Sequence, residues 1–294
     1  MKVFLTGAAG MLAAEVTPLL KNNGFEVTGV DVNPRLSEIE NLDITDKDAV
    51  FNIVQRLKPG YIFHLAAETD VDRCEREPDL AFKVNTIGTE NMALACQKFG
   101  AKLVYISTAA VFFGDQEKPY TEFDIPKPVN VYAQSKWQGE IIVRNLLSEY
   151  FIVRAGWMVG GWEIDKKFVY KIVQQLKGGA GELRVVVDKF GSPTFTKDFA
   201  LNLVALIKTD RYGLYHMANK GAGSRYDIAV KIVELMGLKN KVIVSAINSA
   251  QFPLPAPRGH SEMLRNYKLD LINLNLMPQW EKSLEEYIRV NKDR

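Results

Sequence analysis

The sequence predicts an α/β fold: a Rossmann-type, doubly wound parallel sheet with a smaller, less regular C-terminal lobe. Two observations indicate this architecture. Short, continuously apolar runs alternate with amphipathic helical stretches over the first half of the chain, which is the pattern of βαβ units whose strands are buried on both faces. Beyond about Ala155 the alternation stops, and helices are separated by loops that contain proline and glycine.

Each apolar run of the first half predicts a strand, and each amphipathic stretch predicts a helix. The predicted strands are Lys2–Thr6, Glu26–Asp31, Tyr61–Ala66, Lys102–Ser107 and Phe151–Arg154. The predicted helices are Leu12–Asn22, Asp46–Leu57, Asp79–Phe99 and Val131–Tyr150. Thr45 or Asp46 is the expected N-cap of the second helix, and Gly100 follows the third, where a left-handed residue commonly ends a helix.

The second half carries three further predicted helices, Lys167–Lys177, Thr196–Lys208 and Arg225–Met236. Ser224 and Asp227 have the spacing of a capping box at the start of the last one, and Gly237 ends it. The segment Phe252–Gly259 holds three prolines and is predicted to be a loop. We therefore divide the chain into a sheet domain, residues 1–155, and a lobe, residues 156–294, with a strand at about 212–219 assigned either to the lobe or back to the sheet.

Composition limits the classes of function. Lys and Arg total 37 against 35 Asp and Glu, so the chain shows no electrostatic signature of nucleic acid or membrane binding. The N-terminus does not resemble a signal peptide, and no apolar run is long enough for a membrane-spanning helix. Cys74 and Cys96 have no metal-binding or disulfide spacing and are expected to be reduced thiols. We expect a cytoplasmic protein.

The turn after the first strand is the first motif with a chemical implication. Gly7 and Gly10 allow a tight turn and a close approach of the backbone to a pyrophosphate, and Ala13 keeps the helix packing close. Asp31 ends the second strand, where a carboxylate accepts hydrogen bonds from the adenosine ribose and repels a 2′-phosphate. A dinucleotide is therefore predicted, NAD(H) or NADP(H), with NAD(H) favoured by Asp31 although Arg35 lies nearby. The predicted cofactor contacts in this region are Gly7, Gly10, Met11, Leu12 and Asp31.

Tyr132 and Lys136 lie four residues apart on a predicted helix and so share one face. Such a pair is common on exposed helices, but Thr108 follows a predicted strand at the sheet edge where ligands bind. A ketone that accepts a hydride needs a proton donor, and an adjacent ammonium lowers the pKa of a phenol. We predict that Tyr132 is the general acid/base, that Lys136 tunes it and holds the nicotinamide ribose, and that Thr108 hydrogen-bonds the reacting oxygen. Tyr132 and Lys136 are thus also cofactor contacts.

With these motifs in place, the sequence resembles the extended short-chain dehydrogenase/reductases over nearly its whole length. The shared residues are Gly7-x-x-Gly10, Asp43-Ile44, His64-Leu-Ala-Ala67, Val84-Asn85, Ser107-Thr108 and Tyr132-x-x-x-Lys136. Within this superfamily it is most similar to the dTDP-4-dehydrorhamnose reductases, on stretches that include Thr69–Asp72, Pro119–Glu122, Arg154–Trp157, Gly191–Thr194, Tyr215–Asn219 and Ala256–Arg258.

The resemblance implies a cofactor-binding first domain, a substrate-binding lobe, and reduction of a nucleotide-linked 4-keto-6-deoxy sugar to the L-rhamnose form. It implies Asp43 and Ile44 near adenine, and Ala66 and Ala67 along the cofactor. Trp157 and Arg258 would contact the nucleotide sugar. Without the resemblance, Trp157 is interpreted as part of the lobe core or its rim, and Arg258 as simply exposed. His64 is interpreted as a satisfied residue near the sheet end rather than a catalyst.

The sequence also departs from these reductases. Ala109 and Ala110 replace the usual Asp-Tyr after the fourth strand, as in sugar-nucleotide epimerases and dehydratases. Some members bind Mg²⁺ through a glutamate matching Glu15, but Lys197 occupies the expected place of a second ligand, so we predict no required metal. Three hypotheses stay open: the reductase, an epimerase or a reductase of another nucleotide sugar, and a non-catalytic dinucleotide-binding regulatory subunit. A homodimer is an option.

Overall fold

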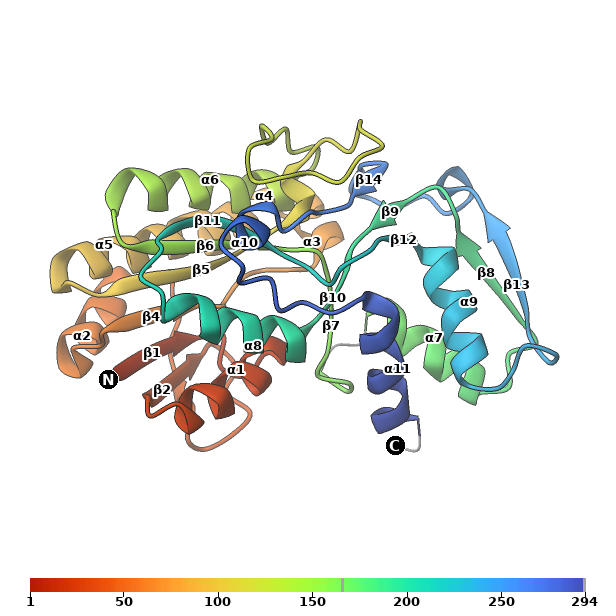
Figure 1. The fold of residues 1–294 in the computed structure, drawn as a ribbon. Helices are drawn as coiled ribbons and strands as arrows, with labels where there is room; N and C mark the ends of the chain where they lie inside the picture. The colour runs from red at the N-terminus through yellow and green to blue at the C-terminus, as the bar shows by residue number, and fades with distance from the viewer. Residues whose placement is uncertain (165–166, 293–294) are drawn as a thin grey trace.

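The computed structural model describes residues 1–164 and 167–292 of the chain. Seven parallel strands form one sheet in the order β11-β6-β5-β4-β1-β2-β3 (Figure 1). The strand order changes direction between β1 and β4, which is the switch point where open sheets bind ligands. The predicted Rossmann-type fold is confirmed. The strands are β1 Lys2–Thr6, β2 Glu26–Asp31, β3 Glu40–Asn41, β4 Tyr61–His64, β5 Lys102–Thr108, β6 Tyr150–Ala155 and β11 Gly213–Met217.

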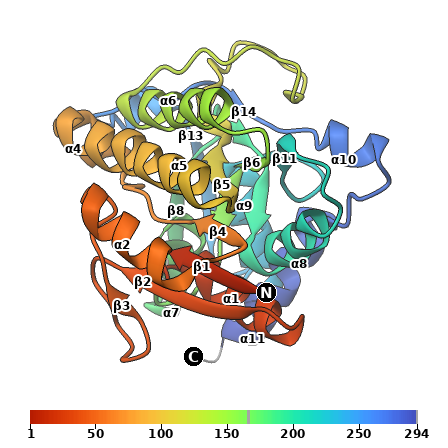
Figure 2. The same cartoon turned by 90° about the vertical axis from the view of Figure 1, so that its left-hand side faces the viewer.

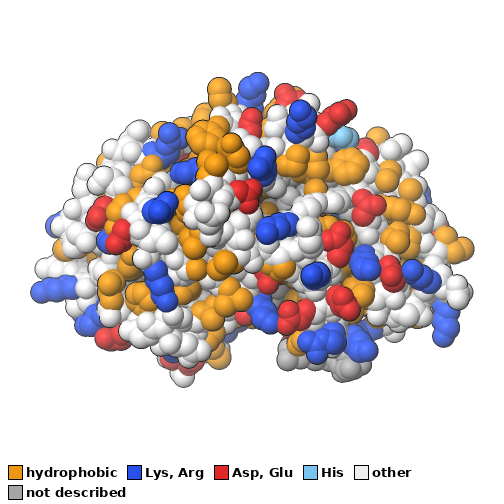
Figure 3. All heavy atoms as spheres, in the orientation of Figure 1, with side chains coloured by type: hydrophobic (Ala, Val, Ile, Leu, Met, Phe, Trp, Pro, Cys, Tyr) orange, Lys and Arg blue, Asp and Glu red, His pale blue; other side chains and the backbone are white. Residues whose placement is uncertain are grey.

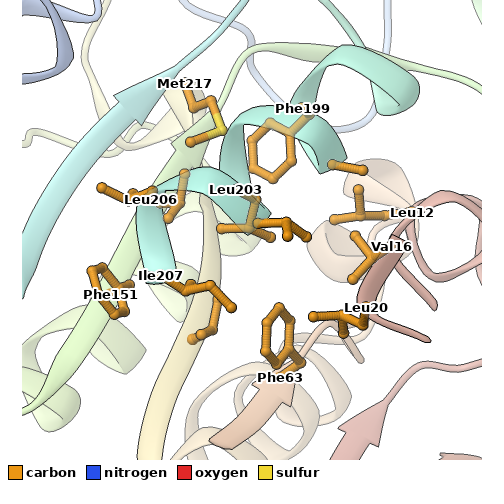
Figure 4. Close-up of a cluster of buried hydrophobic side chains, with 14 of the residues drawn as sticks. Leu12, Val16, Leu20, Phe63, Phe151, Phe199, Leu203, Leu206, Ile207 and Met217 are labelled. Atoms are coloured by element: carbon orange, nitrogen blue, oxygen red, sulfur yellow. The ribbon is translucent and has the colours of Figure 1, made fainter. Parts of the chain in front are cut away.

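Helices cover both faces of this sheet because its strands are apolar on both sides. One face packs on α1 (Met11–Asn22) and α8 (Thr196–Ile207), with Leu12, Val16, Phe199 and Leu203 in the shared core (Figure 4). Figure 2 shows the opposite face under its own helices. These are α2 Lys47–Leu57, α5 Gly88–Phe99 and α6 Val131–Leu146.

The lobe surrounds a third apolar core, built mainly from α7, α9 and α11. It holds three small sheets, in which β7 pairs with β10, β8 with β13, and β9 with both β12 and β14. Ser224 and Asp227 form the predicted capping box at the start of α9. The lobe elements are β7 Trp157–Val159, α7 Phe168–Lys177, β8 Glu182–Val186, β9 Phe190–Gly191, β10 Pro193–Phe195, β12 Gly223–Ser224, α9 Arg225–Leu235, β13 Ile243–Ile247, β14 Ser261–Glu262 and α11 Trp280–Asn291.

Parts of the second half belong structurally to the sheet domain. Strand β11 pairs with β6 at the sheet edge, and α8 and α10 (Tyr267–Leu271) pack beside it. Phe199 and Leu269 are fully buried in the same core as α1. The boundary at residue 155 therefore marks where the chain first leaves the sheet.

Two predicted helices are longer in the sequence analysis than in the structure. The stretch Asp79–Phe99 divides into α4 (Pro78–Phe82), a π-helical turn η1 (Lys83–Ile87) and α5, preceded by α3 (Val71–Arg76). The helix from Val131 ends at Leu146 because Leu147 is extended and Tyr150 already pairs with Leu103 in the sheet. The local helical pattern does not predict the division of the first helix or the end of the second, because contacts with distant residues determine both.

The surface gives no sign of a dominant charge on the face shown in Figure 3, where basic and acidic side chains are interspersed. None of the helices within the described ranges combines the length and apolarity that crossing a membrane requires. Cys74 and Cys96 are free cysteines, and both are buried.

Candidate active site

A cavity of about 1470 Å³ lies where the carboxyl ends of β1, β2, β4, β5 and β6 face the lobe. A volume above that of an ordinary small-ligand pocket fits a dinucleotide together with a second ligand. The structure brings every predicted site residue to the wall of this cavity. They are Gly7, Gly10, Met11, Leu12, Asp31, Asp43, Ile44, Ala66, Ala67, Thr108, Tyr132, Lys136, Trp157 and Arg258.

The glycine turn fits a diphosphate. Gly7 has a φ of +72°, and a Cβ there would come within 2.7 Å of the backbone N of Ala66, so only glycine allows this turn to pack against the end of β4. Helix α1 begins after Gly10 without a side-chain cap, which leaves its first-turn N–H groups available at the cavity wall.

Asp31 is attached to this turn. Its Oδ2 accepts a hydrogen bond from the backbone N–H of Ala9 at 3.0 Å, and its Oδ1 accepts one from Asn33 at 2.9 Å. A carboxylate has about four acceptor positions, so the side chain retains capacity for ribose hydroxyls. Asp31 therefore shapes the glycine turn in addition to the ribose contact that the sequence predicts.

Tyr132 reaches the cavity from the first turn of α6, and Thr108 from the end of β5. The hydroxyl of Thr108 accepts a hydrogen bond from the N–H of Ala110 at 3.1 Å. Burial raises the pKa of Tyr132 to about 12, and a hydrogen bond with Thr108 opposes this increase. The expected lowering of this pKa by Lys136 is wrong for this structure: desolvation raises the pKa of the phenol, the charge of Glu262 raises it further, and Lys136 is not among the groups that act on it.

Lys136 is buried one turn along α6 from Tyr132. Its Nζ lies 4.2 Å from the ring centroid of Tyr105. Burial lowers the pKa of Lys136 to about 7, and the negative charge of Glu140 partly offsets this effect. The side chain is therefore close to its titration point at neutral pH.

Buried polar contacts hold α6, the helix that carries Tyr132 and Lys136, against the sheet domain. Asn85, in the π-helical turn, donates from Nδ2 to the carbonyl of Glu68 and to Oγ of Ser135, each at 3.0 Å. Oγ of Ser135 in turn donates to the carbonyl of Tyr132 at 2.8 Å. In the sequence analysis, Asn85 appears only among the residues that carry the family resemblance. No local sequence pattern predicts that its side chain connects Glu68 with α6.

His64 lies at the end of β4, near Lys136, and is not free to act as a base. Its ring nitrogens contact the hydroxyls of Thr6 at 2.9 Å and Thr89 at 3.0 Å. Burial lowers the pKa of His64 to about 3, so the ring is neutral. This confirms the interpretation of His64 as a satisfied residue near the sheet end.

The lobe supplies the opposite wall. Nε1 of Trp157 donates to Oε2 of Glu262 at 2.7 Å, and the guanidinium of Arg225 lies 3.7 Å from the Trp157 ring centroid. Arg258 forms an ion pair with Asp72 at 2.9 Å, and its carbonyl accepts a hydrogen bond from Lys189 at 2.9 Å. Trp157 and Arg258 thus both line the cavity, and Trp157 also packs against the apolar core of the lobe.

Several polar residues of this wall are absent from the sequence prediction, among them Lys189, Arg225 and Glu262. No local pattern identifies them, because each lies within or next to a two-residue strand whose partner is distant in the sequence: Glu262 in β14, Lys189 just before β9, and Arg225 just after β12. The sequence predicts only that the proline-containing segment Phe252–Gly259, which precedes Glu262, is a loop.

The family model for the RmlD substrate binding domain matches residues 1–292. The chain is 33% identical to dTDP-4-dehydrorhamnose reductase of Aggregatibacter actinomycetemcomitans, over 97% of each sequence. Among solved structures, it superposes on a dTDP-4-dehydrorhamnose reductase of Clostridium acetobutylicum ATCC 824 with a TM-score of 0.92 at 39% identity, covering 99% of both chains.

The dTDP-4-dehydrorhamnose reductase of Bacillus anthracis str. Ames, solved in complex with NADP, gives a TM-score of 0.90 at 37% identity and covers 99% of both chains. These likenesses cover both the sheet domain and the lobe. The chain belongs to the RmlD substrate-binding-domain family, within the extended short-chain dehydrogenase/reductases.

Proposed function

We propose that the protein is an oxidoreductase that uses a nicotinamide dinucleotide to reduce dTDP-4-dehydrorhamnose to dTDP-L-rhamnose. The observation that carries the proposal is the position of Thr108, Tyr132 and Lys136 on one cavity wall beside the glycine turn. The family and the full-length likeness to dTDP-4-dehydrorhamnose reductases support the substrate class.

The residues divide the reaction between them. When bound, a reduced nicotinamide would supply the hydride for the sugar carbonyl carbon. Tyr132 gives its phenolic proton to the carbonyl oxygen, and the hydroxyl of Thr108 donates a hydrogen bond to the same oxygen. Burial raises the pKa of Tyr132 to about 12, so the phenol stays protonated, as a general acid for reduction requires. Lys136 binds the nicotinamide ribose and supplies positive charge when protonated.

The glycine turn and Asp31 support binding of NAD(H) or NADP(H). The uncapped N-terminus of α1 would hold the diphosphate, and Ala66 and Ala67 would lie along the cofactor. Asp43 and Ile44 would flank adenine. We propose a modest preference for NAD(H), because the carboxylate of Asp31 disfavours a 2′-phosphate, while the B. anthracis relative binds NADP.

The charge of the cavity supports a nucleotide-linked substrate. Within the described part of the chain, nine Lys or Arg and four Asp or Glu line it, although the chain as a whole is almost balanced. Arg258, Lys189 and Arg225 belong to the lobe side of the lining. A diphosphate would be attracted to this wall, and Arg258 has the forked geometry that suits phosphate oxygens.

The test is to mix the protein with dTDP-4-dehydrorhamnose and one equivalent of NADH or NADPH and to follow absorbance of the reduced nicotinamide. Stoichiometric oxidation with formation of dTDP-L-rhamnose is expected. Conversion of a nucleotide sugar without net cofactor oxidation would instead indicate the epimerase. Cofactor binding without turnover of dTDP-, UDP- or GDP-linked sugars would indicate the regulatory subunit.

A further inference from the structure

Glu262 lies on the same cavity wall as Trp157 and Arg258 and has no role in the proposed mechanism. We propose that Glu262 recognises the sugar of the substrate: its carboxylate accepts a hydrogen bond from a ring hydroxyl of the bound nucleotide sugar. This inference rests on the proposed function for the identity of the substrate. It deepens that function by naming a residue that sets specificity for the sugar rather than for the nucleotide.

Three neighbours fix the position of Glu262. Its strand β14 pairs with β9, which places Glu262 opposite Gly191. A Cβ on Gly191 would come within 2.3 Å of Cε2 of Trp157, so the indole lies directly against the bare backbone of that strand. The indole N–H then donates to Oε2 of Glu262 at 2.7 Å, while Arg225 packs on the ring. The carboxylate is therefore held before any substrate binds.

The negative charge of Glu262 itself favours contact with a neutral part of the substrate. Among the described lining residues after Ala155, Glu262 is the one acidic side chain, and the charged residues near it are basic. A carboxylate repels phosphate, so it is not suited to the diphosphate of either ligand. The sugar is the neutral part, and its hydroxyl groups are the hydrogen-bond donors that a carboxylate accepts.

Glu262 also lies near the reacting end of the cavity. Its negative charge contributes to the raised pKa of Tyr132, which places the carboxylate within electrostatic reach of the proposed proton donor. Ala110 lines the same cavity with only a methyl side chain. The indole N–H occupies one of about four acceptor positions on the carboxylate, which leaves others for a ligand. Because a hydrogen bond to a charged group contributes about 1.5–3 kcal/mol, its loss corresponds to roughly tenfold or more in affinity.

The experiment compares binding of dTDP-L-rhamnose, its 2-deoxy and 3-deoxy analogues, and dTDP, by calorimetry with saturating NADP⁺. We compare the wild type with two variants, Glu262→Ala and the control Glu285→Gln. Glu285 is exposed on α11. Wild type and control should bind one deoxy analogue roughly tenfold more weakly than dTDP-L-rhamnose. Glu262→Ala should bind dTDP-L-rhamnose as weakly as that analogue and should bind dTDP within about twofold of wild type.

The inference would be overturned if wild type and Glu262→Ala discriminated equally between dTDP-L-rhamnose and its deoxy analogues. So would an equal loss of dTDP and dTDP-L-rhamnose, which would mean that Glu262 only supports Trp157. Trp157→Phe keeps a ring but removes the indole N–H, and it should reduce discrimination less than Glu262→Ala. If wild type binds no dTDP ligand, the proposed substrate is wrong, and UDP-glucose against UDP then provides the same comparison; failure to bind any nucleotide sugar would overturn both proposals.

Discussion

The carboxylate of Glu140 and the guanidinium of Arg154 form an ion pair, with 2.6 Å between Oε2 and Nη2 and both side chains 1% exposed. The hydroxyl of Ser107 and Nε of Arg154 also bond to Oε1 of Glu140. The pair joins α6, one turn beyond Lys136, to β5 and β6. It therefore holds the helix that carries Tyr132 against the sheet edge that carries Thr108.

Removing one partner should leave an uncompensated buried charge. We expect Glu140→Leu or Arg154→Met to lower the free energy of unfolding by about 3–5 kcal/mol, measured by urea denaturation. The double variant should recover much of this loss because neither charge remains. Glu40→Gln, in the exposed pair with Arg56, is the control and should change stability by less than about 1 kcal/mol. Single variants as stable as that control would contradict the interpretation.

Tyr132→Phe removes the proposed proton donor and little else. We expect turnover to fall at least about a hundredfold while the Kd for NADH or NADPH stays nearly unchanged. Steady-state kinetics and fluorescence titration of the cofactor measure the two quantities. Wild-type turnover in this variant would remove Tyr132 from the mechanism, and a large loss of cofactor affinity would make it a binding residue.

Asp31→Ala should change cofactor preference. Loss of the carboxylate removes both the ribose acceptor and the repulsion of a 2′-phosphate, so the preference for NADH over NADPH should fall by roughly tenfold. Because Asp31 also bonds to Ala9 in the glycine turn, affinity for both cofactors should decrease as well. The matched control is Asp48→Ala, an exposed site on α2 outside the cavity lining, which should leave both affinities unchanged. An unchanged NADH-to-NADPH ratio would exclude Asp31 from the ribose site.

Lys136 makes stability depend on pH. Burial lowers its pKa from the ordinary 10.5 to about 7 in the folded state, so between these two values the unfolded chain binds the additional proton. The contribution of Lys136 to stability is therefore most unfavourable below pH 7 and improves as pH rises toward 10.5. Lys136→Met should be more stable than wild type at about pH 6, by a few degrees in Tm, and the difference should shrink by about pH 9.5. A difference independent of pH would mean that Lys136 stays charged when buried.

Sequence reasoning succeeded where a feature is local. The glycine turn, Asp31 at a strand end and the helical spacing of Tyr132 and Lys136 are each visible in a short window, and the parallel topology then brings them to one edge. It failed where contacts between residues far apart in the sequence determine the local structure or the pKa. The π-helical turn at Asn85 depends on contacts with Glu68 and Ser135, and the pKa of Tyr132 depends on how deeply the cavity buries it.

Glu262 shows the same limit for the lobe. Its place at the cavity follows from the pairing of β14 with β9 and from the absence of a side chain on Gly191, which lies about seventy residues earlier in the chain. Nothing in the sequence around Glu262 indicates that partner. Resemblance identified Trp157, which is the residue that Glu262 bonds, but it did not identify Glu262 itself.

The return of α8, β11 and α10 to the sheet after the chain has first entered the lobe has a practical consequence for engineering. The lobe of a relative cannot be grafted as one continuous segment, because that exchange would also replace β11, α8 and α10, which belong to the sheet domain. Chimeras intended to alter sugar choice must instead exchange separate pieces of the lobe at several junctions.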